Sequence, residues 1–294
     1  ERDKRASDSH GDIVFWPLLA LARYLVASAD TDLLDVALPF YDEPGPATLW
    51  QHVERALVVI GARRIAGTNL AAYGHGDWND ALQPADPALR DQLCSTWTVT
   101  LHHQVLTTLA TALRGGSHDE RSAALETEAA LVLSDFQRLL VVDGVIAGYA
   151  LFADTAAAQP TSVLLHPGDR TTGLRYSLLP MMHAILGDML SPLQAQAHRA
   201  LIETHLTGPD GARLFDRPLD YRGGPERIFQ RAESGAFFGR EIGVMYMHAH
   251  LRYAEMLAHV GDARAFFTAL CKAHPIGLRG WVPNADLRQA NCYF

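Results

Sequence analysis

The chain has 294 residues, of which 48% are hydrophobic and 20% are charged, which is the composition of a globular protein and excludes a disordered one. The net charge of −8 excludes the basic surface that would hold nucleic acid, and favours a neutral or small anionic ligand. Three scattered cysteines, Cys94, Cys271 and Cys292, have neither disulfide nor zinc-site spacing. They indicate a reducing compartment, and we expect the cytoplasm.

No apolar run reaches the ~18 residues that span a bilayer, and the N-terminal residues lack the apolar core of a signal peptide. We therefore expect a soluble chain without a membrane segment. The sequence begins without methionine and ends on the apolar stretch "NCYF", which favours an incomplete part of a longer protein.

Apolar residues recur at helical spacing in most of the chain. The stretches with this spacing are 12–30, 47–63, 87–116, 117–141, 175–190, 191–206, 242–261 and 262–274. Asp12 is a predicted N-cap, with Pro17 near the first turn of its helix, and Ser191 is a second N-cap followed by Pro192. The glycine pair 115–116 is predicted to end the third helix.

Only two stretches, 141–152 and 279–285, read as extended, which is too few for a sheet core. Short connections alternate with long ones, and the longest loop, 213–241, combines aromatic residues with paired charges. These features predict an all-α protein of antiparallel helix pairs, an α/α toroid whose mouth collects the long loops. A superhelical array of helix pairs is the alternative.

One loop stands out, "AAYGHGDWNDALQPADP" at 71–87. Gly74 and Gly76 permit positive φ or close backbone approach. Its polar residues are types whose side chains fold back onto the backbone in turns: Asp77, Asn79 and Asp80. Turn chemistry does not explain Trp78, because an indole beside a carboxylate is typical of a site that grips a sugar ring. The residues alone leave both interpretations open.

The run "GDWNDALQ" resembles the catalytic loop of the inverting disaccharide phosphorylases, the cellobiose and chitobiose phosphorylase family, glycoside hydrolase family 94. By position, this resemblance implies that Asp80 is the general acid and that Trp78 contacts the sugar whose bond is broken. Asp77 and Asn79 would shape the loop, and Asp77 counts among the substrate-binding candidates. The resemblance also implies an (α/α)6-toroid-type catalytic domain, of which residues 1–294 form one incomplete part.

Other segments carry the same resemblance. Residues 7–40 are similar to the family's segment before the catalytic loop, while 213–255 and 283–294 look like the branch of 1,2-β-oligoglucan phosphorylase and the phosphorylase-like part of cyclic β-1,2-glucan synthases. The chain departs from the family in three places. A Phe-Arg-Asp-Ser motif is absent, the stretch "GAFFGREIG" stands where a phosphate-binding histidine is expected, and a Thr-Gly pair would lie beyond Phe294.

The implied reaction needs one carboxylic acid, which protonates the leaving oxygen while inorganic phosphate attacks the anomeric carbon from the opposite face. The expected product is α-glucose 1-phosphate from a β-linked glucoside, with phosphate as co-substrate and no cofactor. A hydrolase of the same fold would need a second carboxylate, ~6.5–9.5 Å from the acid, to activate water. The alternatives are that hydrolase and a non-catalytic carbohydrate-binding helical module.

The remaining site predictions rest on residues whose types and spacing are less distinctive. Substrate candidates are His166, Arg231 and Glu233, and phosphate candidates are Arg240 and Gln289. The charged residues among them also suit a mutually neutralising structural network. The histidine pairs 102–103 and 248/250 do not share a helix face, so no metal site is predicted. The expected partners are a β-linked oligosaccharide and phosphate, with a second copy of the chain as the candidate protein partner.

Overall fold

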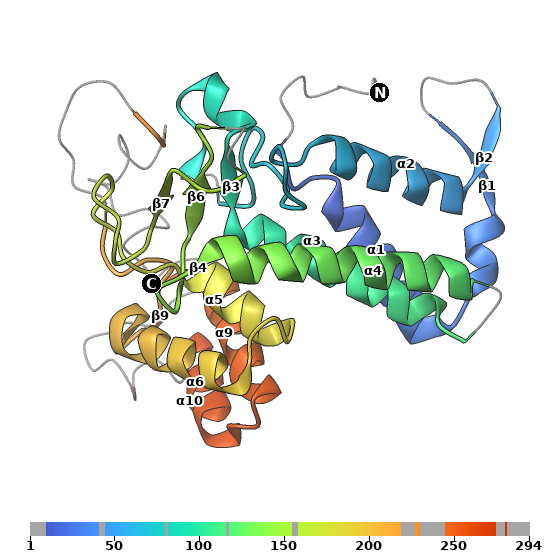
Figure 1. The fold of residues 1–294 in the computed structure, drawn as a ribbon. Coiled ribbons are helices and arrows are strands. Elements are labelled where there is room, and N and C mark those ends of the chain that lie inside the picture. Colours follow the sequence, from blue (N-terminus) through green and yellow to red (C-terminus); the bar gives the residue numbers. More distant parts are fainter. Residues whose placement is uncertain are drawn as a thin grey trace, which may run out of the picture.

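A computed structural model describes residues 10–40, 45–79, 82–115, 118–154, 158–218, 227–229, 245–274 and 280. Within these residues each of the eight stretches of helical spacing contains an α-helix (Figure 1). The helices are α1 (Phe15–Ser28), α2 (Leu49–Ala62), α3 (Thr96–Leu113), α4 (Asp119–Asp135), α5 (Leu178–Leu186), α6 (Pro192–Leu201), α9 (Met247–His259) and α10 (Ala263–Ala273). The prediction of a mostly helical protein is confirmed.

The prediction of an all-α protein is confirmed only in part, because short antiparallel strands join the helices. They are β1 (Ala37–Pro39), β2 (Pro46–Thr48), β3 (Leu93–Ser95), β4 (Val141–Val142), β5 (Val145–Ile146), β6 (Tyr149–Leu151), β7 (Ser162–Leu164), β8 (Thr207–Gly208) and β9 (Gly211–Ala212). The extended stretch 141–152 is confirmed as β4 to β6, and β3, β6 and β7 form one sheet. Strands of two or three residues are too short for an alternating pattern to reveal them.

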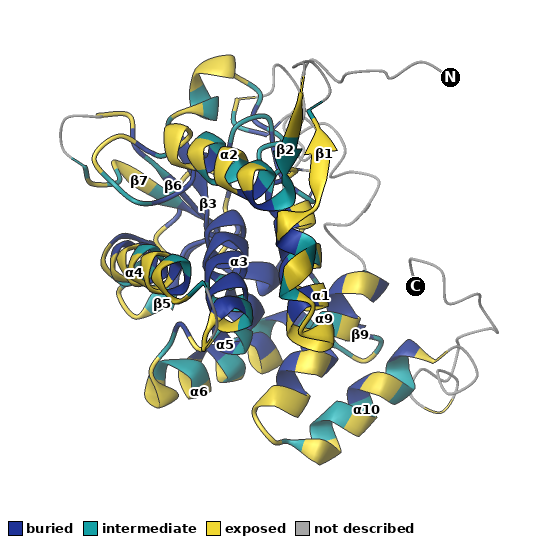
Figure 2. Cartoon of the chain, turned by 90° about the vertical axis from the view of Figure 1, so that its right-hand side faces the viewer, coloured by how far each residue is buried: buried dark blue, intermediate teal, exposed yellow. Residues whose placement is uncertain are grey.

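The helices form two rows. Helix α3 packs against α1, α4 and α5, and α5 packs in turn against α9. The pairs α3–α4, α5–α6 and α9–α10 are each in contact, so α1, α3, α5 and α9 form an inner row and α4, α6 and α10 an outer one. Figure 2 shows α3 buried at the centre, while α4, α6 and α10 expose one side. Most buried hydrophobic residues of these helices belong to one contiguous core, while Met247 of α9 and Ala273 of α10 form a small second cluster with Met245.

The start and stop signals predicted from the sequence can be checked at the ends of α6 and α3, and then at the start of α1. Ser191 caps α6 in a capping box: its Oγ accepts from Gln194 N at 3.3 Å, and the Gln194 side chain accepts from Ser191 N at 2.9 Å. The stop after α3 is also confirmed, with Gly115 at φ +80°. Helix α3 begins nine residues later than position 87, because a 3-10 turn and β3 come first.

Asp12 does not cap α1, which begins at Phe15. Its carboxylate is buried and accepts instead from the indole Nε1 of Trp16 at 2.9 Å. The N-cap prediction is therefore wrong, since a tertiary contact takes the carboxylate that a local capping rule assigns to the backbone.

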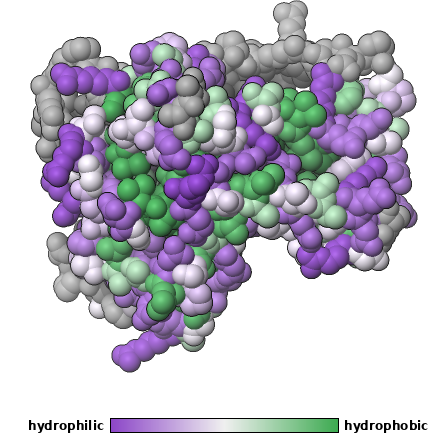
Figure 3. Space-filling view, viewed as in Figure 1, coloured by the Kyte–Doolittle hydropathy of each residue, from purple (hydrophilic) through white to green (hydrophobic). Residues whose placement is uncertain are grey.

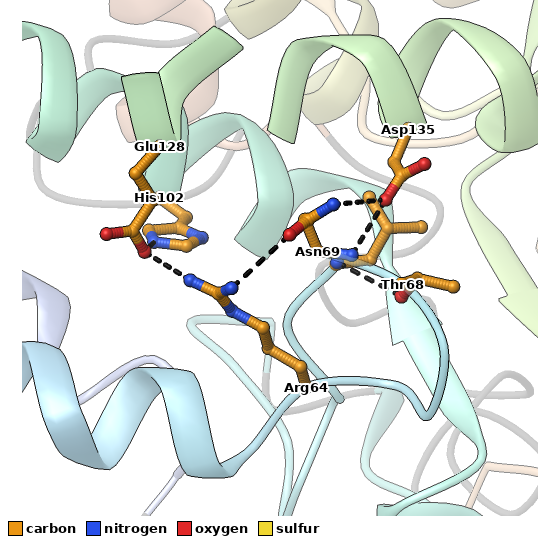
Figure 4. Close-up of polar contacts among 7 residues, drawn as sticks. Arg64, Thr68, Asn69, His102, Glu128 and Asp135 are labelled. Atoms are coloured by element: carbon orange, nitrogen blue, oxygen red, sulfur yellow. Dashed lines mark hydrogen bonds and ion pairs between the residues drawn. The ribbon is translucent and has the colours of Figure 1, made fainter. Parts of the chain in front are cut away.

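We call residues 71–87 the motif loop. A polar network holds the segment between α2 and this loop against the outer row of helices (Figure 4). Arg64 donates to Glu128 of α4 and, at 3.3 Å, to Asn69 Oδ1. The backbone N and the side-chain Nδ2 of Asn69 donate to Asp135 at 2.7 and 2.9 Å. His102 of α3 lies 3.6 Å from Glu128. The entry to the motif loop is thereby fixed to α4.

The surface is mixed. In the view of Figure 3 hydrophobic side chains show in patches between hydrophilic ones and do not form one continuous apolar face. Among the described residues, no helix combines the length and the hydropathy needed to cross a membrane.

Candidate active site

The motif loop makes its turn at two glycines. Gly74 has φ +60° and Gly76 has φ +123°, as the sequence predicts for a loop with positive φ. The Gly76 carbonyl accepts from Gly11 N at 2.7 Å, and a Cβ at Gly76 would lie 3.1 Å from the side chain of Gln83. The loop is thus folded tightly between the residues before α1 and the residues that follow the motif.

Asp77 fixes the loop to the beginning of α3. Its Oδ1 accepts from Asn79 N at 2.9 Å, and its Oδ2 accepts from Ser95 Oγ at 2.6 Å and Thr98 Oγ1 at 3.3 Å. Burial raises the pKa of Asp77 to about 6, because desolvation of the carboxylate outweighs these hydrogen bonds and the nearby charge of Asp12 adds to it. These hydrogen bonds join Asp77 to the motif loop, β3 and α3, and its direct contact with a sugar stays a prediction.

Trp78 lies in a cluster of aromatic rings. It is half-buried and meets Tyr246 edge to face at 5.2 Å between ring centroids, with Trp97 at 6.4 Å and His248 at 6.3 Å. Trp97 in turn lies 5.8 Å from Trp16. We call these five residues the aromatic panel. Stacking of Trp78 on a sugar stays a prediction, and its surroundings are aromatic rather than aliphatic.

The aromatic panel is built from the starts of the inner helices. Trp16, Trp97 and His248 are each the second residue of a helix, in α1, α3 and α9 respectively. The N-terminal ends of three inner helices therefore meet the motif loop at one end of the molecule. Sequence reasoning selects Trp78 of this group and misses the other four. The sequence contains one signal that could have found three of them: an aromatic residue recurs at the second position of a helix.

His166 is buried within its own loop. Its ring Nε2 donates to Val142 O at 3.0 Å, and its Nδ1 accepts from Gly168 N at 3.0 Å. Asp169 ties the same loop together by accepting from Leu165 N at 2.9 Å and from Thr171 N at 2.7 Å. Both ring nitrogens of His166 are engaged with backbone, and its role in sugar binding stays a prediction.

Several predicted site residues lie outside the described residues. They are Asp80, Arg231, Glu233, Arg240 and Gln289. Their roles stay predictions.

The other histidines singled out in the sequence lie in two settings. His250 is buried, with Nδ1 accepting from Ala212 N at 3.0 Å and Nε2 donating to Ala269 O at 2.8 Å, whereas His248 is exposed on the aromatic panel. In the described ranges no group of three or more His, Cys, Asp or Glu side chains could hold a metal ion.

A cavity of about 340 Å³ borders the motif loop at Gly74 and His75. Its wall also contains Arg63, Arg90 and Asp91, but neither Asp77 nor Trp78 lines it. This cavity therefore lies beside a different part of the loop from the aromatic panel.

Comparison with known proteins identifies the class. Residues 2–146 match the profile described as "Glycosyl hydrolase 94 superfamily, catalytic domain". The chain is also 40% identical, over 98% of its length, to a protein of Listeria innocua serovar 6a named 1,2-beta-oligoglucan phosphorylase. The predicted resemblance to this family and to its 1,2-β-oligoglucan phosphorylase branch is confirmed by both matches. The chain spans 26% of the length of that relative.

Solved structures show a similar fold at low sequence identity. The unsaturated glucuronyl hydrolase of Bacillus sp. GL1 has a TM-score of 0.51 and 13% identity, covering 92% of this chain and 62% of that one. A structure of UGL with dGlcA-Glc-Rha-Glc has a TM-score of 0.51 and 12% identity, covering 93% and 63% respectively. These likenesses concern the fold alone.

Proposed function

We propose that the chain is part of the catalytic domain of an inverting glycoside phosphorylase, which cleaves a β-linked glucoside with inorganic phosphate and releases α-glucose 1-phosphate. The observation that carries this proposal is the 40% identity, over 98% of the chain, to a protein named 1,2-beta-oligoglucan phosphorylase. A β-1,2-linked glucoside is accordingly the first substrate to test.

The geometry around Trp78 supports a sugar site. Its indole is half-buried in the aromatic panel, where the rings of Trp16 and Trp97 come from different helices. Aromatic faces pack well against the apolar faces of sugar rings, and a rigid cluster loses little entropy on binding. We assign substrate contact to Trp78 and Asp77, and with them to His166, Arg231 and Glu233.

In the proposed reaction Asp80 is the general acid. Its proton passes to the glycosidic oxygen as the bond from that oxygen to the anomeric carbon breaks. A phosphate oxygen forms a new bond to the same carbon from the opposite face, so that the configuration changes from β to α. We assign the phosphate to Arg240 and Gln289. Phosphate is itself the nucleophile, and no second carboxylate base is required.

We extend the proposal to the architecture: residues 1–294 belong to one domain, an incomplete part of an (α/α)6 toroid. Support comes from the inner row α1, α3, α5 and α9 backed by α4, α6 and α10, and from the main core, to which all of these helices contribute buried residues or residues packed against it. The gathering of three inner-helix N-termini at the motif loop agrees with a toroid whose mouth carries the site.

The test is phosphate release from α-glucose 1-phosphate with glucose or sophorose as acceptor, in wild type and in Asp80→Asn. The amide keeps the shape of the carboxyl but has no acidic proton, so we expect the rate to fall about 10²–10⁴-fold. Phosphorolysis of a glycosyl fluoride should fall less, because fluoride leaves with little protonation.

Three outcomes would contradict the proposal. Near-normal turnover by Asp80→Asn would remove Asp80 from the role of acid. Hydrolysis of sophorose at the same rate with and without phosphate would identify an inverting hydrolase, and sugar binding without either reaction would identify a carbohydrate-binding module.

A further inference from the structure

The residues immediately before α1 form a strap across the motif loop. His10 pairs with Gly74 in an antiparallel bridge, and Gly11 N donates to Gly76 O at 2.7 Å. A Cβ at position 11 would lie 2.4 Å from the carbonyl oxygen of Tyr73, so only glycine permits this approach. We call residues 10–12 the N-terminal strap.

The N-terminal strap reaches both sides of Asp80 in the sequence. On one side the backbone of Trp78 lies close to the Asp12 carboxylate: burial raises the pKa of Asp12, and the backbone N–H of Trp78 is among the groups that oppose this rise. On the other side His10 Nε2 and Gln83 Nε2 lie 2.9 Å apart. The strap thus constrains the chain two residues before and three residues after the proposed acid.

The carboxylate of Asp12 also holds the indole ring of Trp16. Its carboxylate is 2% exposed, and Trp16 Nε1 donates to its Oδ2 at 2.9 Å. One buried carboxylate therefore accepts from the ring of Trp16 on α1 and lies close to the backbone N–H of Trp78 in the motif loop. Hydrogen bonds to a charged acceptor are roughly twice as strong as neutral ones, which makes this an effective point of attachment.

The two indoles flank Trp97. Its ring centroid lies 5.8 Å from that of Trp16 and 6.4 Å from that of Trp78. The ring of Trp16 remains 38% exposed, so it can contact a ligand while its N–H is held by Asp12. Asp12 therefore connects the ring of Trp16 with the backbone of Trp78.

We propose that Asp12 is a positioning residue of the candidate active site, which holds Trp16 and Trp78 in the relative orientation that receives a glucosyl unit of the β-linked substrate. This inference rests on the proposed function. Asp12 acts through the two tryptophans and takes no part in proton transfer. A displacement of about 1 Å in substrate placement lowers the rate by about 10²-fold, which sets the scale of the effect.

The experiment compares Asp12→Asn with Asp32→Asn, an exposed carboxyl in the 3-10 turn 31–35. An asparagine at position 12 turns its own N–H toward either the indole N–H of Trp16 or the backbone N–H of Trp78, so that one of these two groups faces another donor. We expect kcat/KM for phosphorolysis of sophorose to fall about 10- to 100-fold in Asp12→Asn and to stay within twofold of wild type in Asp32→Asn. Far-UV circular dichroism checks that each variant is folded.

A second variant separates positioning from a general loss of stability. Trp16→Phe removes the indole N–H, so an asparagine at position 12 can turn its oxygen to Trp78 N without an opposing donor. Asp12→Asn should therefore lower kcat/KM by a smaller factor in the Trp16→Phe background than in wild type. Equal factors in both backgrounds, or a loss within twofold in wild type, would overturn the proposal.

Failure of the proposed function gives a different result. If wild type shows no phosphorolysis, sophorose binding by calorimetry and the near-UV dichroism of the tryptophans replace the rate. Weaker binding and an altered tryptophan signal in Asp12→Asn alone would support positioning of a sugar platform. Unchanged binding and an unchanged signal would refute it, whichever reaction the protein catalyses.

Discussion

At the scale of single residues, Asp77 combines a structural role with an unfavourable ionisation. Its pKa rises from 3.8 to about 6 in the folded chain because burial disfavours the carboxylate. Between those values the folded state binds a proton that the unfolded state has released. The contribution of Asp77 to stability is therefore greatest in acid and decreases as the pH rises from about 4 to about 6.

Asp77→Asn should remove this dependence. The amide can accept from Asn79 N through its oxygen and donate to the hydroxyl of Ser95, which can act as an acceptor. Relative to wild type, the unfolding free energy of the variant should rise by up to about 3 kcal/mol between about pH 4 and pH 7. Urea denaturation at several pH values measures the difference, and a constant difference would show that Asp77 does not titrate in this range.

Trp78 should matter more for sugar than for the fold, because its ring is only half-buried. Trp78→Ala removes a stacking surface worth about 0.5–1.5 kcal/mol, so sophorose should bind about 2- to 10-fold more weakly while the melting temperature changes little. Calorimetry and thermal denaturation measure the two effects. A large drop in melting temperature with unchanged sugar affinity would make Trp78 a core residue.

The sequence could indicate only part of this site. Asp77 and Trp78 stand next to each other in one unusual loop, so their grouping is visible without a structure. Asp12, Trp16 and Trp97 join them only through folding, and nothing in their spacing shows that they meet. A local capping rule gives Asp12 the wrong partner, because the indole of Trp16 competes for its carboxylate.

At the scale of elements, the end of a helix can be predicted from its neighbouring residues more reliably than the candidate site can. The capping box of Ser191 and Gln194 starts α6 with Pro192 in its first turn, as the sequence predicts. The strands outside 141–152 escape prediction because they are two or three residues long, as in the pair β8 and β9, and carry no detectable period. Their positions are set by the hairpin geometry between helices.

Ser191→Ala tests the capping box of α6. The substitution leaves the backbone N–H of Gln194 without its side-chain acceptor and should lower the unfolding free energy by about 1 kcal/mol, within 0.5–2. Ser191→Asp should retain most of the stability, since aspartate is an equally good N-cap. Urea denaturation at neutral pH is the measurement. Equal stability of the alanine variant and wild type would show that the cap is dispensable.

At the scale of the whole molecule, the position of α3 determines how the chain holds together. Its residues contact α1, α4 and α5, and most of its side chains are buried (Figure 2). The network of Arg64, Glu128 and Asp135 attaches the segment before the motif loop to α4, which packs against α3 (Figure 4). The candidate site therefore depends on the same central helix as the core.

Leu106→Ala should destabilise the whole described fold rather than one part of it. Leu106 is fully buried in α3, and truncation of a buried leucine typically costs about 2–5 kcal/mol. Because one contiguous core joins α1 to α9, two probes should report the same loss of stability: tryptophan fluorescence, which reports mainly on α1 to α3, and far-UV circular dichroism, which reports on every helix.

The matched control is Leu193→Ala, since Leu193 in α6 is 79% exposed and its truncation should change stability by less than about 0.5 kcal/mol. Both probes should shift to the same lower urea midpoint in Leu106→Ala. A shift in fluorescence with an unchanged circular dichroism transition would mean that α6, α9 and α10 unfold as a separate unit, and the single-domain proposal would then be wrong.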